Sequence, residues 1–170
     1  MNESNYVEKY SYSFVLGSNV LQILIYLIGI YLVYLLHPLG VVFYLAYILL
    51  LEIHLLNKSC IHCYYYGKRC AFGKGLLCSL FFKKGDSKKF IEKKISMKDL
   101  IPDFLVTLIP LIIGVYLLST EFNWTILILL VCIFILGFPV TGYLRGNLAC
   151  KYCKQKKIGC PAEKAFNKKK

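Results

Sequence analysis

Residues 14–36 run FVLGSNVLQILIYLIGIYLVYLL and contain no Lys, Arg, Asp or Glu. An α-helix rises about 1.5 Å per residue, so roughly 20 such residues cross the hydrocarbon core of a bilayer. The run therefore predicts a membrane-spanning helix. The segment before it carries two Glu and one Lys, and no small-residue cleavage site follows it. We expect a retained helix, not a signal peptide.

Three further apolar runs have the same character, and 58% of the chain is hydrophobic. Proline lacks the N–H that a continuing helix needs, so His37-Pro38 predicts a turn after the first run. The predicted spans are residues 14–36, 39–56, 100–118 and 124–144.

The basic residues predict the orientation of these spans. The 21 Lys and Arg comprise Lys9, eleven residues in 58–98 and nine in 145–170, and the two short hairpin turns have none. Cytosolic loops of membrane proteins are enriched in Lys and Arg. We therefore expect a multi-pass protein of the cell membrane with both termini and the long loop in the cytosol. This rule explains the net charge of +12 more simply than nucleic-acid binding does.

The order of the segments predicts an internal repeat. The fold class is all-α: a four-transmembrane-helix bundle built from two parallel helical-hairpin repeats, each followed by a cytosolic cysteine-rich module. The predicted parts are the N-terminal segment with the first hairpin (1–56), a basic loop (57–99), the second hairpin (100–144) and a basic tail (145–170).

Six of the eight cysteines form two copies of one pattern, Cys-x-x-Cys followed by six residues and a third cysteine. A repeated spacing at equivalent places in a repeat is far less expected by chance than a single Cys-x-x-Cys. Cys132 lies alone in the last span, where we expect it to be a small apolar residue. The two modules are Cys60, Cys63 and Cys70, and Cys150, Cys153 and Cys160.

This spacing favours zinc, which takes four thiolate ligands in a tetrahedron. Three cysteines leave each module one ligand short. We therefore expect a joint site of one or two ions, formed either by all six sulfurs with bridging ligands or by the two Cys-x-x-Cys pairs. Cys78 and His62 are additional candidate ligands. Nearby cations would lower the pKa of the thiols: Lys68, Arg69, Lys74, Lys151, Lys154, Lys156 and Lys157.

Residues 149–161, ACKYCKQKKIGCP, resemble one half of the fungal binuclear zinc-cluster DNA-binding domain. The resemblance implies six cysteines around two zinc ions, with Cys60 and Cys150 as bridging ligands. A membrane hairpin separates the halves here, and Tyr64-Tyr65-Tyr66-Gly67 replaces the family's basic residues, so we interpret the likeness as convergence. The whole chain also resembles archaeal cysteine-rich multi-pass membrane proteins with YYYGKRC and CPAEK segments, here 64–70 and 160–164; that likeness implies no activity.

Other interpretations stay open. A cytosolic location disfavours disulfides outside hyperthermophiles, and an iron–sulfur cluster would also use thiolates. The segment GLLCSLFF (75–82) predicts either an interfacial helix or packing on the cysteine modules. We expect the basic residues to meet anionic headgroups or a protein partner: Lys68, Arg69, Lys74, Lys83, Lys84, Lys151, Lys154, Lys156 and Lys157.

No Gly-rich phosphate loop, Ser/His/Asp set or HExxH motif occurs. The sequence therefore favours a scaffold or interaction protein with structural zinc over an enzyme. The alternatives are a membrane-bound iron–sulfur electron-transfer protein and a membrane-tethered nucleic-acid binder.

Overall fold

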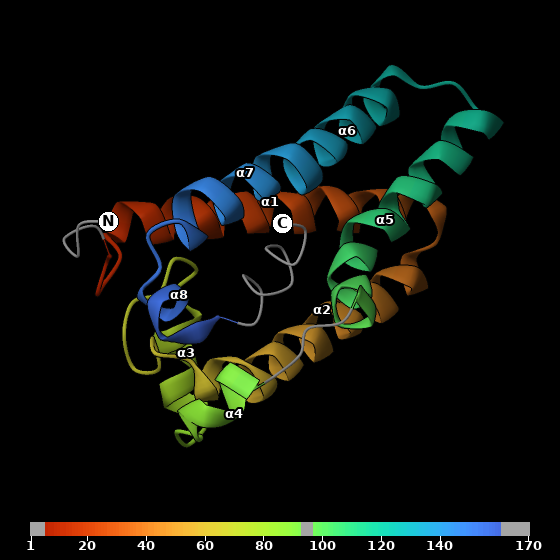
Figure 1. Ribbon diagram of the computed structural model, residues 1–170. Helices are drawn as coiled ribbons and strands as arrows, with labels where there is room; N and C mark the ends of the chain where they lie inside the picture. Colours follow the sequence, from red (N-terminus) through yellow and green to blue (C-terminus); the bar gives the residue numbers. More distant parts are fainter. Residues whose placement is uncertain (1–5, 93–96, 161–170) are drawn as a thin grey trace. The chain divides into compact units, whose positions relative to one another are not determined.

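The computed structural model describes residues 6–92 and 97–160, and these residues are mainly helical (Figure 1). The long helices are α1 (Tyr12–Leu36), α2 (Pro38–Lys58), α5 (Met97–Thr120) and α6 (Trp124–Ile135). Short helices α3 (Lys74–Phe81), α4 (Ser87–Glu92) and α8 (Lys154–Gly159) lie among the cysteine-rich segments, with a 3₁₀ turn, η2, at Cys60–His62. Within this part of the chain the strand-like pairing is a single bridge between Val7 and Cys153.

Four helical stretches are long and apolar enough to span a bilayer: Tyr12–Leu36, Pro38–His62, Ile101–Thr120 and Trp124–Cys150. Helices satisfy all their backbone polar groups internally, as hydrocarbon demands. Large apolar side chains on these helices stay exposed, including Phe43 and Ile112. Such faces suit contact with acyl chains. The predicted all-helical, multi-pass character is therefore confirmed.

The last span continues further than the predicted end at residue 144. After α6 the chain passes through a π-helical turn, η3 (Leu136–Val140), a short α7 (Thr141–Tyr143) and a second π-helical stretch, η4 (Leu144–Cys150). Pro139 lacks an N–H and cannot extend an α-helical ladder, and π-turns commonly absorb such an interruption. The helix therefore ends at the first cysteine of the second module.

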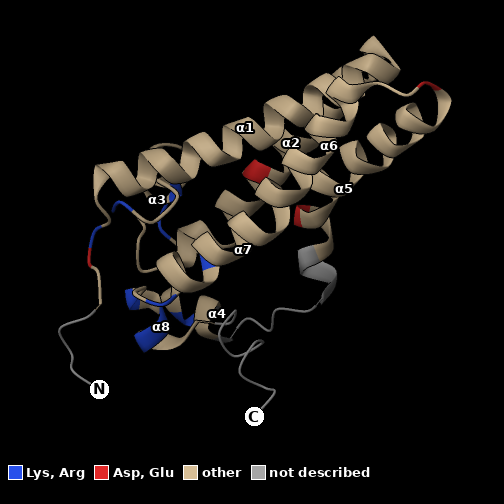
Figure 2. Cartoon of the chain, turned by 90° about the horizontal axis from the view of Figure 1, so that it is seen from above, with Lys and Arg blue, Asp and Glu red and all other residues tan. Residues whose placement is uncertain are grey.

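The chain forms two compact units. The cysteine unit comprises Met1–Asn19, Ile53–Met97 and Leu144–Lys170, and the span unit comprises Val20–Glu52 and Lys98–Tyr143. Every Lys and Arg whose side chain the structure describes belongs to the cysteine unit (Figure 2). The described basic side chains therefore belong to the same unit as the two cysteine modules.

The span unit is held together by two apolar clusters and by close helix approaches. One cluster centres on Leu32 and Ile133, and the other on Val33 and Tyr44. The Tyr44 hydroxyl donates to the carbonyl of Val106 at 2.6 Å. Small residues allow helices to approach closely in membranes, where apolar surface is not itself a driving force.

One acidic side chain of the span unit has a partner within it. The hydroxyl of Tyr26 on α1 donates to Oε1 of Glu52 on α2 at 2.9 Å. This hydrogen bond ties Glu52 to a neighbouring helix, which reduces the penalty of holding a carboxylate in an apolar segment.

Candidate functional site

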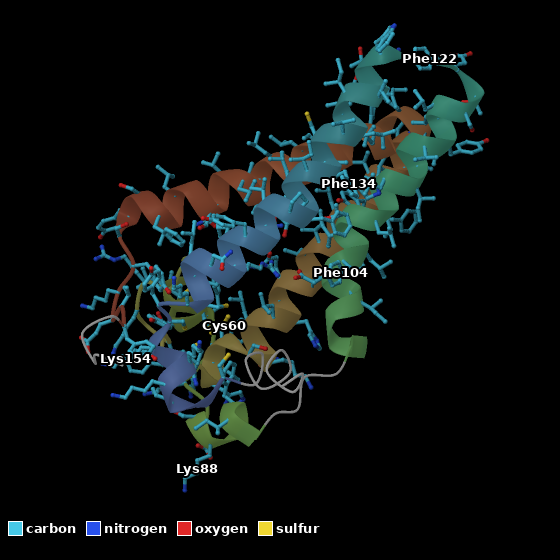
Figure 3. The ribbon with its side chains drawn as sticks, turned by 45° about the horizontal axis from the view of Figure 1, so that its top comes forward. Cys60, Lys88, Phe104, Phe122, Phe134 and Lys154 are labelled. Carbon is cyan, nitrogen blue, oxygen red and sulfur yellow. The ribbon has the colours of Figure 1, made fainter. Side chains whose placement is uncertain are left out.

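The cysteine unit contains both cysteine modules, and none of the eight cysteines of the chain forms a disulfide. Cys60 in η2 and Lys154 at the start of α8 mark the two modules in Figure 3. Segments that are 90 residues apart in sequence thus belong to one compact body.

The two Cys-x-x-Cys segments adopt the same turn. In the first, the N–H of Cys63 donates to the carbonyl of Cys60 at 3.2 Å, and in the second Cys153 donates to Cys150 at 3.3 Å. Each second cysteine then accepts from the residue three positions later, at 3.1 Å in both cases. The repeated spacing therefore corresponds to a repeated local structure.

Backbone N–H groups point at several of the sulfurs. Cys63 receives the N–H of Tyr65, and Cys153 receives the N–H of Gln155, which occupies the equivalent position. The N–H of Gly75 donates to Cys70 Sγ at 3.3 Å. Such bonds favour the thiolate over the thiol and lower a cysteine pKa. They are the contacts that a thiolate ligand would use to disperse its charge.

The modules differ between their second and third cysteines. Residues 64–67 form turns, and Gly67 at their end has a φ of 70°. The second module instead forms α8, which ends at Gly159 with a φ of 124°. Both glycines adopt backbone conformations that L-residues rarely adopt. Different backbone paths thus lead to the two third cysteines.

The buried side chain of Gln155 joins the two modules. Its Oε1 accepts from the N–H of Tyr64 at 2.7 Å, and its Nε2 donates to the carbonyl of Gly159 at 3.2 Å. The side chain is 4% exposed. An amide that satisfies backbone groups from both modules fixes their register.

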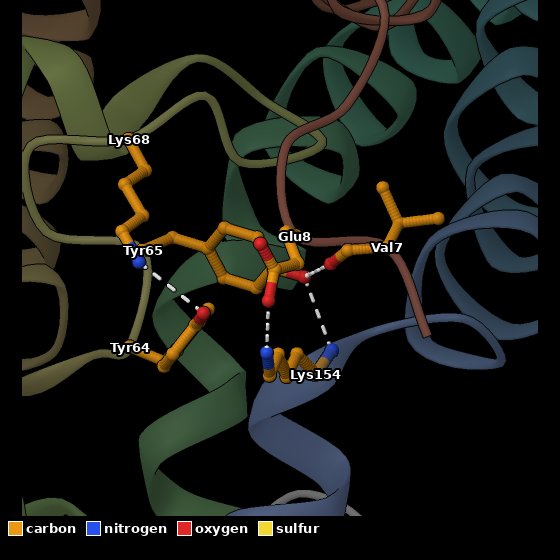
Figure 4. Close-up of polar contacts among 6 residues, drawn as sticks. All are labelled: Val7, Glu8, Tyr64, Tyr65, Lys68 and Lys154. Atoms are coloured by element: carbon orange, nitrogen blue, oxygen red, sulfur yellow. Dashed lines mark hydrogen bonds and ion pairs between the residues drawn. The ribbon is translucent and has the colours of Figure 1, made fainter. Parts of the chain in front are cut away.

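Tyr65 forms a second connection, which includes the N-terminal segment (Figure 4). Its hydroxyl donates to the carbonyl of Val7 and accepts from the N–H of Lys154 at 3.0 Å. Beside it, Glu8 forms an ion pair with Lys154, which lowers the pKa of the Glu8 carboxyl. Three separate segments of the chain therefore meet at one tyrosine ring.

An apolar cluster underlies these bonds. It contains Tyr10, Tyr65, Ala71 and Ala149, with Cys63, Cys70 and Cys153 packed against it. The hydroxyl of Tyr10 donates to the carbonyl of Ala149 at 2.6 Å. Sulfurs from both modules thus share one largely desolvated environment.

The electrostatic neighbours of Cys63 come from both modules. Burial raises the pKa of this thiol to about 12, and the nearby thiols of Cys153, Cys70 and Cys160 raise it further. Burial raises the pKa of Cys153 as well. Clustered, desolvated thiols are poor acids by themselves, whereas a bound cation reverses this preference because it stabilises the thiolate.

The side-chain positions do not form a finished metal cage. Within residues 6–92 and 97–160, no three His, Cys, Asp or Glu side chains converge closely enough to hold an ion. The donor chemistry, the shared environment and the N–H groups aimed at sulfur suit a thiolate-bound metal. Ligation requires the sulfurs to turn toward a common point.

The two additional candidate ligands have other contacts. His62 Nδ1 lies 2.9 Å from the carbonyl oxygen of Asp86. Cys78 is fully buried, with Sγ 3.6 Å from the carbonyl oxygen of Leu56, although it is also an electrostatic neighbour of Cys60.

Several basic residues lie over aromatic rings. The Lys68 ammonium is 4.2 Å from the ring centroid of Tyr64, and the Arg69 guanidinium is 3.9 Å from that of Tyr12. Cation–π contacts of this kind hold charges at a surface without a carboxylate partner.

Sequence reasoning missed Tyr10, Tyr65 and Gln155 as organising residues. In the sequence, Tyr65 stands out only because it departs from a basic pattern. Gln155 carried a usable signal, because it is the uncharged residue in the run Lys154–Lys157. The chain matches no protein-family model, curated protein or solved structure in comparisons with each.

Proposed function

We propose that the protein is a membrane scaffold or interaction protein whose two cysteine modules jointly bind structural zinc. The observation that carries this proposal is that cysteines of both modules, Cys63, Cys70 and Cys153, pack against one apolar cluster. Zinc held only by thiolates has no open position for water, so the site would stabilise the fold and would not catalyse a reaction.

The residues that would hold the metal are the six cysteines of the two modules. Six sulfurs can bind two ions through bridging ligands, or the two Cys-x-x-Cys pairs can bind one. The N–H groups of Tyr65, Gln155 and Gly75 would support the thiolates. Bound zinc would supply free energy that holds the modules together, because its ligands must deprotonate and assemble when it binds.

A duplicated hairpin and a cytosolic location of the modules complete the proposal. Matching turns at Cys60–Cys63 and Cys150–Cys153 support a repeat. The concentration of Lys and Arg in the cysteine unit supports the cytosolic side.

Elemental analysis of the purified full-length protein tests the metal. We expect one or two zinc ions per chain, and a colourless protein. Stoichiometric iron with acid-labile sulfide would refute the zinc proposal and support the iron–sulfur alternative. A metal-free protein that keeps its fold would refute a structural role for zinc.

A further inference from the structure

Helix α3 (Lys74–Phe81) has one buried face, which lies on the cysteine unit. Gly75 and Cys78 are its buried residues. A Cβ atom at Gly75 would lie 2.1 Å from the carbonyl oxygen of Tyr65, so the helix is seated against the backbone of the first cysteine module. Residues 75–82 were predicted either to form an interfacial helix or to pack on the cysteine modules, and this contact shows that one face of α3 packs on the first module.

The opposite face of α3 is apolar and open. Leu80 is 77% exposed and Phe81 is 72% exposed. Leu76 and Leu77, one turn earlier, are 43% and 44% exposed. These four large apolar side chains form one patch on a short helix, and exposing such a patch to water is unfavourable.

The contacts of α3 place it at the end of a membrane span. Cys78 Sγ lies 3.6 Å from the carbonyl oxygen of Leu56, and Leu56 is in the last turns of α2. The span that includes α2 ends at His62. A helix beside the end of a span lies where the hydrocarbon meets the headgroups.

The charges around the patch complement anionic lipid. Residues 74–84 contain Lys74, Lys83 and Lys84 and no Asp or Glu. Lys83 and Lys84 are exposed and directly follow Phe81 and Phe82. An apolar face bordered by lysines is the composition of helices that lie in the plane of the bilayer interface.

We propose that α3 is an interfacial anchor, with Leu76, Leu77, Leu80 and Phe81 inserted at the acyl–headgroup boundary and the lysines on anionic headgroups. The anchor is independent of zinc. It would hold the first cysteine module against the membrane surface, because the buried face of the same helix rests on that module.

Tryptophan fluorescence tests the anchor in the full-length protein. The chain has one tryptophan, Trp124, so Trp124→Phe provides a background without the fluorophore. Leu80→Trp then reports on the open face of α3, and the matched control is Lys88→Trp on the exposed surface of α4. Both variants are reconstituted in phosphatidylcholine vesicles with and without phosphatidylglycerol.

We expect the position-80 emission to be blue-shifted and to be lost when brominated lipid is included, while position 88 keeps a water-like emission. Phosphatidylglycerol should increase the quenching at position 80. A water-like emission at position 80 would overturn the anchor. A blue shift without quenching by bromine would also overturn it, because the patch would then be covered by protein. Equal quenching at position 80 with and without phosphatidylglycerol would contradict the proposed contact of the lysines with anionic headgroups.

Discussion

Tyr65→Phe tests whether one hydroxyl holds three segments of the cysteine unit together. The hydroxyl donates to the carbonyl of Val7 and accepts from the N–H of Lys154, and the ring is 2% exposed. A net hydrogen bond contributes about 1 kcal/mol, so losing two should destabilise the local structure by about 2 kcal/mol. Since about 1.4 kcal/mol corresponds to a factor of ten, amides near Lys154 should exchange with solvent roughly 30-fold faster.

Hydrogen–deuterium exchange of the peptide that covers residues 150–160 measures this change. Tyr66→Phe is the matched control, because its hydroxyl donates to the carbonyl of Phe82 at 2.7 Å, within the first cysteine-rich loop. The control should leave exchange at residues 150–160 unchanged. Equal effects of the two substitutions, or no effect of Tyr65→Phe, would refute the three-segment connection.

Two further predictions concern packing and topology. Gly75→Ala should separate α3 from the first module, because the new Cβ would clash with the carbonyl oxygens of Tyr65 and Lys68. The buried thiol of Cys78 should then react with maleimide. The control Gly17→Ala, whose Cβ would have no atom within 4 Å, should leave Cys78 protected. Protection of Cys78 in Gly75→Ala would contradict this packing. The exposed Cys150 should react with an impermeant thiol reagent in cells lysed with a chelator present, and not in intact cells; labelling of intact cells would place the modules outside.

The spans were predictable because a bilayer imposes a simple rule on the sequence. Only a long uncharged apolar run can cross it as a helix, and residues 14–36 satisfy that rule without reference to the rest of the chain. Their exact ends were less predictable. The last helical stretch runs from Trp124 to Cys150 through π-helical turns at Leu136–Val140 and Leu144–Cys150, past the predicted end at residue 144.

The cysteine spacing predicted a joint site but not the residues that connect the two modules. A Cys-x-x-Cys turn is decided by neighbouring residues, so both copies adopt it. Gln155 and Tyr64, in contrast, are 91 residues apart, and Tyr10 and Ala149 are 139 residues apart. Pairings at such separations depend on the whole fold, and no periodicity in a single sequence encodes them.

Zinc retention in a pair of cysteine variants tests the shared site most directly. Cys63→Ser, Cys153→Ser and the double variant are compared with Cys132→Ser, which lies outside both modules, and zinc per chain is measured after dialysis against a chelator. If the modules share their metal, either single substitution should release it to the same extent, and the double substitution should add nothing. If each single variant keeps half of the zinc and the double variant loses all of it, the modules bind separately and the account is wrong.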